Sequence, residues 1–138
     1  MPDWLTIHII GLILVAAVFG GMLSFAALFT PLAFRKLPRD TAAGFMRDVF
    51  PVYYRVMGIA SLVAALPLGL AQGYKAEVAM LVAVTAGFVI ANTVLRPRID
   101  RAREQGRDAV FKILHRTSLI LYLGQFVLVT IVLIRLAQ

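Results

Sequence analysis

The sequence predicts an all-α integral membrane four-helix bundle with basic cytoplasmic connectors, forming a single domain over residues 1–138. Two observations predict this fold class. Hydrophobic residues make up 61% of the chain, against roughly 45–50% in a typical soluble domain. Long uncharged stretches also recur, and the first runs from Trp4 to Phe34. A soluble domain of this size leaves much of its surface in water, so lipid is the solvent that suits so apolar a chain.

The predicted membrane spans cover roughly residues 4–33, 50–72, 77–95 and 113–136. The first uncharged run exceeds the ~20 residues that a helix needs to cross the hydrocarbon core. That helix is therefore expected to tilt, to extend into the interface or to break, and Pro31 is the predicted break. The run is also too long for the apolar part of a signal peptide, and an acid precedes it. We expect a retained membrane helix.

Basic residues set the expected orientation. All of the 14 Lys and Arg residues except Lys75 and Arg135 fall in segments 35–55 and 96–116. Short basic loops stay on the cytoplasmic side of a membrane. In a bacterial inner (plasma) membrane, both connectors then face the cytoplasm and both termini face outward. Topology accounts for the net charge of +7, and no nucleic-acid partner is expected.

The two connectors are also predicted to be helical. A helix is expected to begin after Pro38, with Asp40 or Thr41 as its N-cap, and a helical extension after residue 96 is expected to break near Gly106. The segments 50–55 and 111–116 resemble one another, which fits either a repeat of two parallel hairpins or chance.

Small residues predict how the helices pack, because lipid gives no hydrophobic drive for their association. In the first span one stripe of small residues stands out: Ala16, Gly20, Ser24 and Ala27. The span 113–136 has almost none. We expect that span to lie at the periphery or to contact another membrane protein. The lipid bilayer is the other expected partner, and a homo-oligomer is a further alternative.

Short motifs along nearly the whole chain resemble the family built on domain of unknown function 4149, which is related to eukaryotic transmembrane protein 205. The matching residues are His8–Gly11, Phe19–Gly21, Phe25, Pro31–Phe34, Ala43–Gly44, Val49–Tyr53, Asn92, Pro97, Phe111, Leu114–His115 and Ser118. The resemblance implies a four-helix membrane bundle and little chemistry. A more distant likeness, based on His8 and Gly20–Gly21, is to four-helix haem-binding membrane proteins of the copper-resistance and protoporphyrinogen-oxidase type.

Two candidate sites follow from the polar residues within the spans. His8 is a candidate haem ligand, or it lies at the outer interface with no ligand. Near the cytoplasmic side, five residues are expected to form a polar pocket: Tyr54, Arg55, Asn92, His115 and Ser118. Arg55 has an alternative role, extending to lipid headgroups. A single haem held by both histidines is not expected, because they lie near opposite faces, about 20 Å or more apart in depth.

These sites lead to three functional hypotheses. The first is a non-enzymatic interaction or assembly protein with a cytoplasm-facing polar pocket. The alternatives are a haem-binding redox protein using His8 and a passive channel or carrier for a small solute or anion. No nucleotide-binding loop, metalloprotease motif or nucleophile elbow occurs, and we assign no catalytic residue and no metal ligand. The chain has no Cys, so disulfides and thiolate metal sites are excluded.

Overall fold

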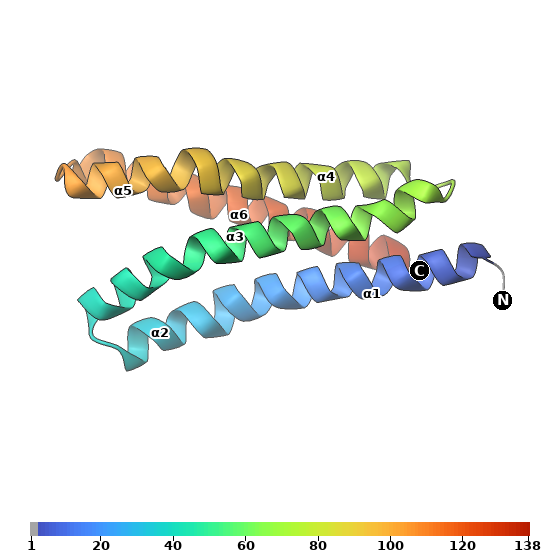
Figure 1. The fold of residues 1–138 in the computed structure, drawn as a ribbon, viewed down its shortest axis with the longest axis horizontal. Coiled ribbons are helices and arrows are strands. Elements are labelled where there is room, and N and C mark those ends of the chain that lie inside the picture. The colour runs from blue at the N-terminus through green and yellow to red at the C-terminus, as the bar shows by residue number, and fades with distance from the viewer. Residues whose placement is uncertain (1–2) are drawn as a thin grey trace.

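The structure is a computed structural model that describes residues 3–138, with side chains described from Leu5 onward. Four helical rods make up this part of the chain (Figure 1). The first rod joins α1 (Asp3–Ser24), the π-helical turn η1 (Phe25–Phe29) and α2 (Thr30–Lys36). The second is α3 (Arg39–Leu70). The third joins α4 (Lys75–Ile90), the π-helical turn η2 (Ala91–Leu95) and α5 (Arg96–Glu104), and the fourth is α6 (Asp108–Ala137).

The rods form an antiparallel bundle in which chain neighbours are also spatial neighbours. α3 packs against α1 and α4, and α6 packs against the same two helices. Among the described residues the backbones of α1 and α4 do not come close to one another, and neither do those of α3 and α6, so each of these pairs lies on a diagonal. Both termini lie at one end of the bundle, and the α2–α3 and α5–α6 connections lie at the other (Figure 1).

Both hairpins are built to the same plan. In each, a long helix passes through a π-helical turn into a short helix whose second residue is a proline, and the chain then reverses. Pro31 follows η1 and Pro97 follows η2, each two residues after the turn ends. Proline lacks an N–H, and its ring collides with the carbonyl four residues earlier. A π-helical turn relieves that collision by widening the helix locally. The predicted break at Pro31 is therefore wrong, and the helix continues to Lys36.

The chain reverses near the predicted positions. Leu37 and Pro38 are extended, and α3 begins at Arg39. The predicted capping by Asp40 or Thr41 is wrong, because Pro38 is the N-cap and no side chain caps this helix. The expected connector helix also has no end of its own and continues through Pro51 to Leu70. The predicted break at Gly106 is confirmed: this residue has a positive φ of 67°, a conformation that glycine adopts without strain.

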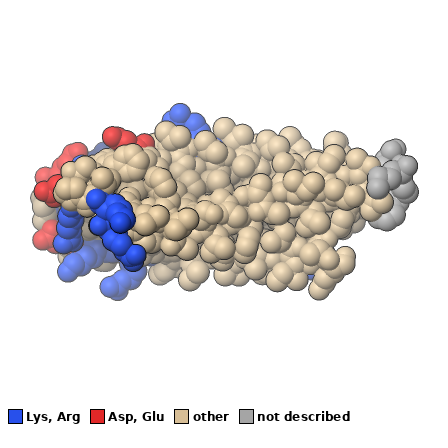
Figure 2. All heavy atoms as spheres, turned by 90° about the horizontal axis from the view of Figure 1, so that it is seen from below, with Lys and Arg blue, Asp and Glu red and all other residues tan. Residues whose placement is uncertain are grey.

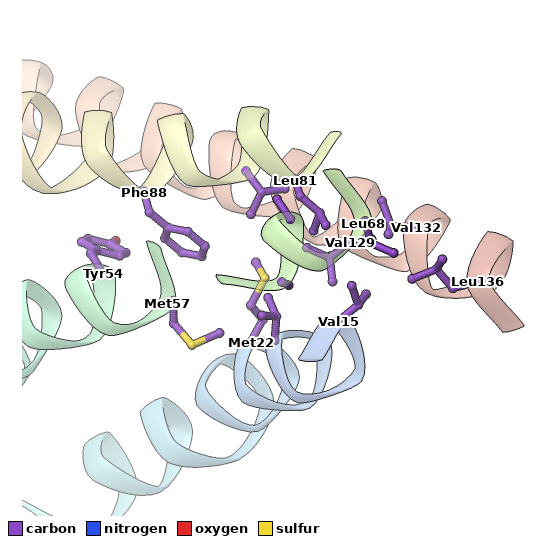
Figure 3. Packing of buried hydrophobic residues seen from close by; sticks show 14 of the residues in the cluster. Val15, Met22, Tyr54, Met57, Leu68, Leu81, Phe88, Val129, Val132 and Leu136 are labelled. Carbon is purple, nitrogen blue, oxygen red and sulfur yellow. The ribbon is translucent and has the colours of Figure 1, made fainter. Parts of the chain in front are cut away.

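The core is formed by apolar side chains that point inward from all four rods (Figure 3). On the first rod this face carries Val15, Val18 and Met22, each almost fully buried. The small-residue stripe predicted to pack in this rod is exposed or half-buried instead: Ala16, Gly20, Ser24 and Ala27. The prediction was wrong because residue size alone does not say which face of a helix meets its neighbours. In the third rod the small residues Gly87 and Ala91 are buried.

The outside of the bundle is apolar along most of its length. Four helices are long and apolar enough to cross a membrane. On the face shown in Figure 2, most of the visible Lys and Arg side chains gather at the end that holds the α2–α3 and α5–α6 connections. α6 packs on α1 and α4 and exposes large apolar residues such as Ile113, Ile120 and Leu123. A protein partner for this helix stays a prediction.

Candidate functional site

A cavity of about 440 Å³ opens in the bundle near the basic end, and all four rods contribute to its lining. Its volume falls in the ~300–1,000 Å³ range of small-molecule sites. The cavity lies beside both π-helical turns, since Phe25 and Ala26 of η1 and Ala91 of η2 line it. Single-turn π-helices often occur at functional sites. The irregularity that accommodates the two prolines therefore also shapes this space.

The lining of the cavity carries more basic than acidic residues. Arg47 of α3 and Arg96 and Arg103 of α5 line it, with Asp100 as the single acidic residue in the lining. Arg96 Nη1 lies 3.7 Å from Asp100 Oδ2. Arg103 lies 5.0 Å from the centre of the Phe111 ring, a cation–π contact. Among the side chains described, neither Arg47 nor Arg103 forms an ion pair. The cavity therefore keeps an excess of positive charge.

The rest of the lining is mostly aromatic and aliphatic. Its apolar side chains come from each rod and include Phe25, Phe34, Phe50, Ile99 and Leu119. Phe25 meets Phe50 edge to face, with 5.5 Å between the ring centres. A space lined by both guanidinium groups and hydrocarbon suits a ligand that has a negative group and an apolar part.

Tyrosines in and beside the cavity lining connect three rods. Tyr54, almost fully buried, and Tyr122 both line the cavity. Tyr122 donates a hydrogen bond to the Met22 carbonyl over 2.8 Å. Because its proton is used there, the 2.6 Å contact between the two hydroxyls must be donated by Tyr53. The chain from Tyr53 through Tyr122 to Met22 joins α3, α6 and α1, and so fixes this part of the cavity wall.

Three of the five predicted pocket residues line the cavity, and two do not. Tyr54, His115 and Ser118 are part of the lining. Arg55 is exposed and is not part of the lining. Asn92 is also outside the lining, but its Oδ1 accepts a hydrogen bond from Arg96 Nε at 3.1 Å and so helps to hold that guanidinium.

The arginines of the cavity were missed because the connectors were predicted to be cytoplasmic helices apart from the pocket, which was assigned to residues of the spans. Helical spacing was the available signal. Arg47 and Tyr54 lie seven residues apart, as do Arg96 and Arg103, and residues seven apart share a helix face. Because α3 is one continuous helix through Pro51, Arg47 lies on the same face as Tyr54. Both side chains therefore line the cavity.

His8 lies at the opposite end of the bundle, in contact with the end of α6. Its Nε2 is 2.7 Å from the Leu136 carbonyl, which can only accept, so this nitrogen carries the proton and donates. In the neutral ring Nδ1 then accepts from the Tyr74 hydroxyl at 2.8 Å. Both ring nitrogens are occupied, and an iron ligand here would have to displace one of these bonds. Haem ligation by His8 stays a prediction that this geometry does not support.

A half-buried ion pair joins the start of α4 to the end of α6. Arg135 Nε donates to Glu77 Oε1 over 2.8 Å. Glu77 is buried, whereas half of the Arg135 side chain is exposed, and Glu77 Oε2 has no partner among the described residues. Together with the His8 contacts, this pair binds the last turns of α6 to α1 and α4.

Four long apolar helices around a common core, with a basic end, define an integral membrane protein of the four-helix bundle class. The family model described as "Domain of unknown function (DUF4149)" matches residues 13–108, and the chain belongs to this family. The resemblance found in the sequence is thereby confirmed at the family level, while the relation to transmembrane protein 205 stays a prediction. No curated protein and no solved structure matches the chain.

Proposed function

We propose that this protein is a non-enzymatic interaction protein of the bacterial inner membrane that binds a small anionic ligand in its basic cavity from the cytoplasmic side. The observation that carries the proposal is the charge of the lining, with Arg47, Arg96 and Arg103 against Asp100 alone. Guanidinium groups bind carboxylates and phosphates through paired, charge-assisted hydrogen bonds.

The position of the cavity supports access from the cytoplasm. Its arginines lie in the two segments that hold nearly all the basic residues of the chain, and such segments stay on the cytoplasmic side. At the other end, the His8 and Arg135 contacts hold α6 against α1 and α4. A ligand therefore has its approach at the basic end.

The absence of native Cys gives a direct test. Ser118→Cys introduces one thiol into the cavity lining, and Gln105→Cys introduces a control thiol in the exposed α5–α6 turn. A membrane-impermeant maleimide is added to inside-out and to right-side-out vesicles. Two probe anions, inorganic phosphate and decanoate, are then tested for protection of each thiol.

We expect both thiols to react in inside-out vesicles alone. At least one anion should slow the reaction of the Ser118→Cys thiol and leave that of the Gln105→Cys thiol unchanged. Reaction from the outer side would overturn the orientation. Equal reaction rates of the Ser118→Cys thiol with and without either anion would overturn the binding function.

A further inference from the structure

A second hollow lies on the outside of the bundle, between the first rod and α3. It has a volume of about 430 Å³. Its lining is almost entirely apolar: Gly21, Ser24, Leu28 and Leu32 along the first rod, with Phe25 and Tyr53 beside them. Ser24, Leu28 and Leu32 are exposed on the surface of a helix long and apolar enough to cross the membrane. This groove therefore faces the hydrocarbon of the bilayer.

The groove and the basic cavity share one wall. Phe25 lines both spaces. Its ring stacks on Tyr53 with the ring centres 3.7 Å apart and the planes within 10°, so a single aromatic pair stands where the two spaces meet. Phe25 is also the first residue of the π-helical turn η1.

The geometry points to a single-chain anionic lipid of the inner leaflet as the ligand, with its headgroup among Arg47, Arg96 and Arg103. Its hydrocarbon chain passes the Phe25–Tyr53 pair and lies in the outer groove. This inference rests on the proposed function and names the ligand class of that same site. The groove runs from Gly21 to Leu32, about 16 Å along a helix, which is enough for much of an acyl chain.

The charge of the cavity and the shared Phe25 wall select this occupant. A free inorganic anion would meet the arginines but would leave the adjoining apolar groove to ordinary bilayer lipid. A neutral lipid would fill the groove but would gain nothing from the excess positive charge of the cavity. A membrane amphiphile with one negative group satisfies both spaces at once, and the groove lets it enter sideways from the leaflet.

Photo-crosslinking tests this assignment on the full chain in membranes. One probe is palmitic acid carrying a diazirine in its chain, and its matched control is the corresponding fatty alcohol, which differs in the headgroup alone. Crosslinked peptides are mapped by mass spectrometry. The variant Arg47→Gln/Arg103→Gln removes headgroup contacts, and Arg101→Gln, an exposed arginine of α5 outside the lining, is its matched control.

We expect the acid to label the groove segment from Gly21 to Leu32. The alcohol and the Arg47→Gln/Arg103→Gln variant should reduce this labelling roughly tenfold, the equivalent of one lost charged hydrogen bond. Arg101→Gln should leave it unchanged. A Phe25→Trp variant, which enlarges the shared wall while keeping it aromatic, should lower labelling of the groove without unfolding the bundle.

Three outcomes would overturn the inference: equal labelling by acid and alcohol, labelling spread over the exposed face of α6, or labelling that the cavity arginines do not affect. The failure of this inference is distinguishable from failure of the proposed function. If phosphate or decanoate protects the Ser118→Cys thiol but the groove is not labelled, anion binding stands and the lipid assignment falls. If no anion protects that thiol either, both fall.

Discussion

Replacing Gly87 by Ala should destabilise the bundle, because this glycine of α4 lies directly against the Gln125 side chain of α6. A Cβ placed on Gly87 would lie 2.6 Å from Gln125 Nε2 and 2.8 Å from its Cδ. The amide cannot simply withdraw, since Gln125 is buried and its Nε2 donates to the Val84 carbonyl over 2.8 Å.

The size of the effect follows from three contributions. Overpacking costs about 1–3 kcal/mol. Loss of the Gln125 bond adds about 0.6 kcal/mol, the average for side-chain hydrogen bonds in membrane proteins. The better helix propensity of Ala offsets about 1 kcal/mol. Together these predict that Gly87→Ala lowers the free energy of unfolding by roughly 0.5–2.5 kcal/mol.

The assay is an SDS titration in detergent micelles, followed by circular dichroism, which gives the free energy of unfolding. Gly124→Ala is the matched control: it is next to Gln125 in sequence, and its Cβ would meet nothing within 4 Å. The double variant Gly87→Ala/Gln125→Ala should show a coupling of at least about 1 kcal/mol, because the shortened side chain removes the collision. Equal stabilities of Gly87→Ala and Gly124→Ala, or the absence of coupling, would refute this reasoning.

Other contacts give predictions for the same titration. His8→Leu should lower the free energy of unfolding by about 1–2 kcal/mol, because it removes two hydrogen bonds. The control Thr6→Leu changes an exposed residue and should leave that free energy unchanged. Equal effects of the two substitutions would contradict the role of the imidazole. Tyr122→Phe should cost about 1 kcal/mol and increase amide exchange around η1; unchanged exchange would count against its contact with the first rod. Arg135→Leu should cost about 1–3 kcal/mol by leaving Glu77 buried without its partner, and adding Glu77→Gln should restore most of this loss. No restoration would show that the charge is not the cause.

The fold class and the turns were predictable because they depend on local chemistry. Uncharged runs long enough to cross hydrocarbon identify the membrane helices. Pro38 and Gly106 mark the two reversals at the basic end through their own backbone preferences. These signals depend on the residues themselves and not on which helices they meet.

The cavity was only partly predictable because it depends on which faces of the helices meet. Tyr54, His115 and Ser118 were identified from their depth alone, and depth also suggested Arg55 and Asn92, which lie outside the lining. Likewise two faces of α1 have the same helical spacing: one carries Ala16 and Gly20, and the other carries Val15, Val18 and Met22. The helices that pack against α1 determine which face is buried. A single sequence contains no direct record of those neighbours.

The two π-helical turns also change how positions along a rod relate to one another. Each turn accommodates one residue beyond the α-helical repeat, so the side chains past it are rotated by about 100° relative to a regular helix. In the first rod, residues at helical spacing therefore share one face before Phe25 and a rotated face after Phe29. In the third rod the same rotation occurs between Ala91 and Leu95. The exposure of successive side chains along these two rods should therefore follow the helical period of about 3.6 residues. This pattern should shift by one residue at η1 and again at η2.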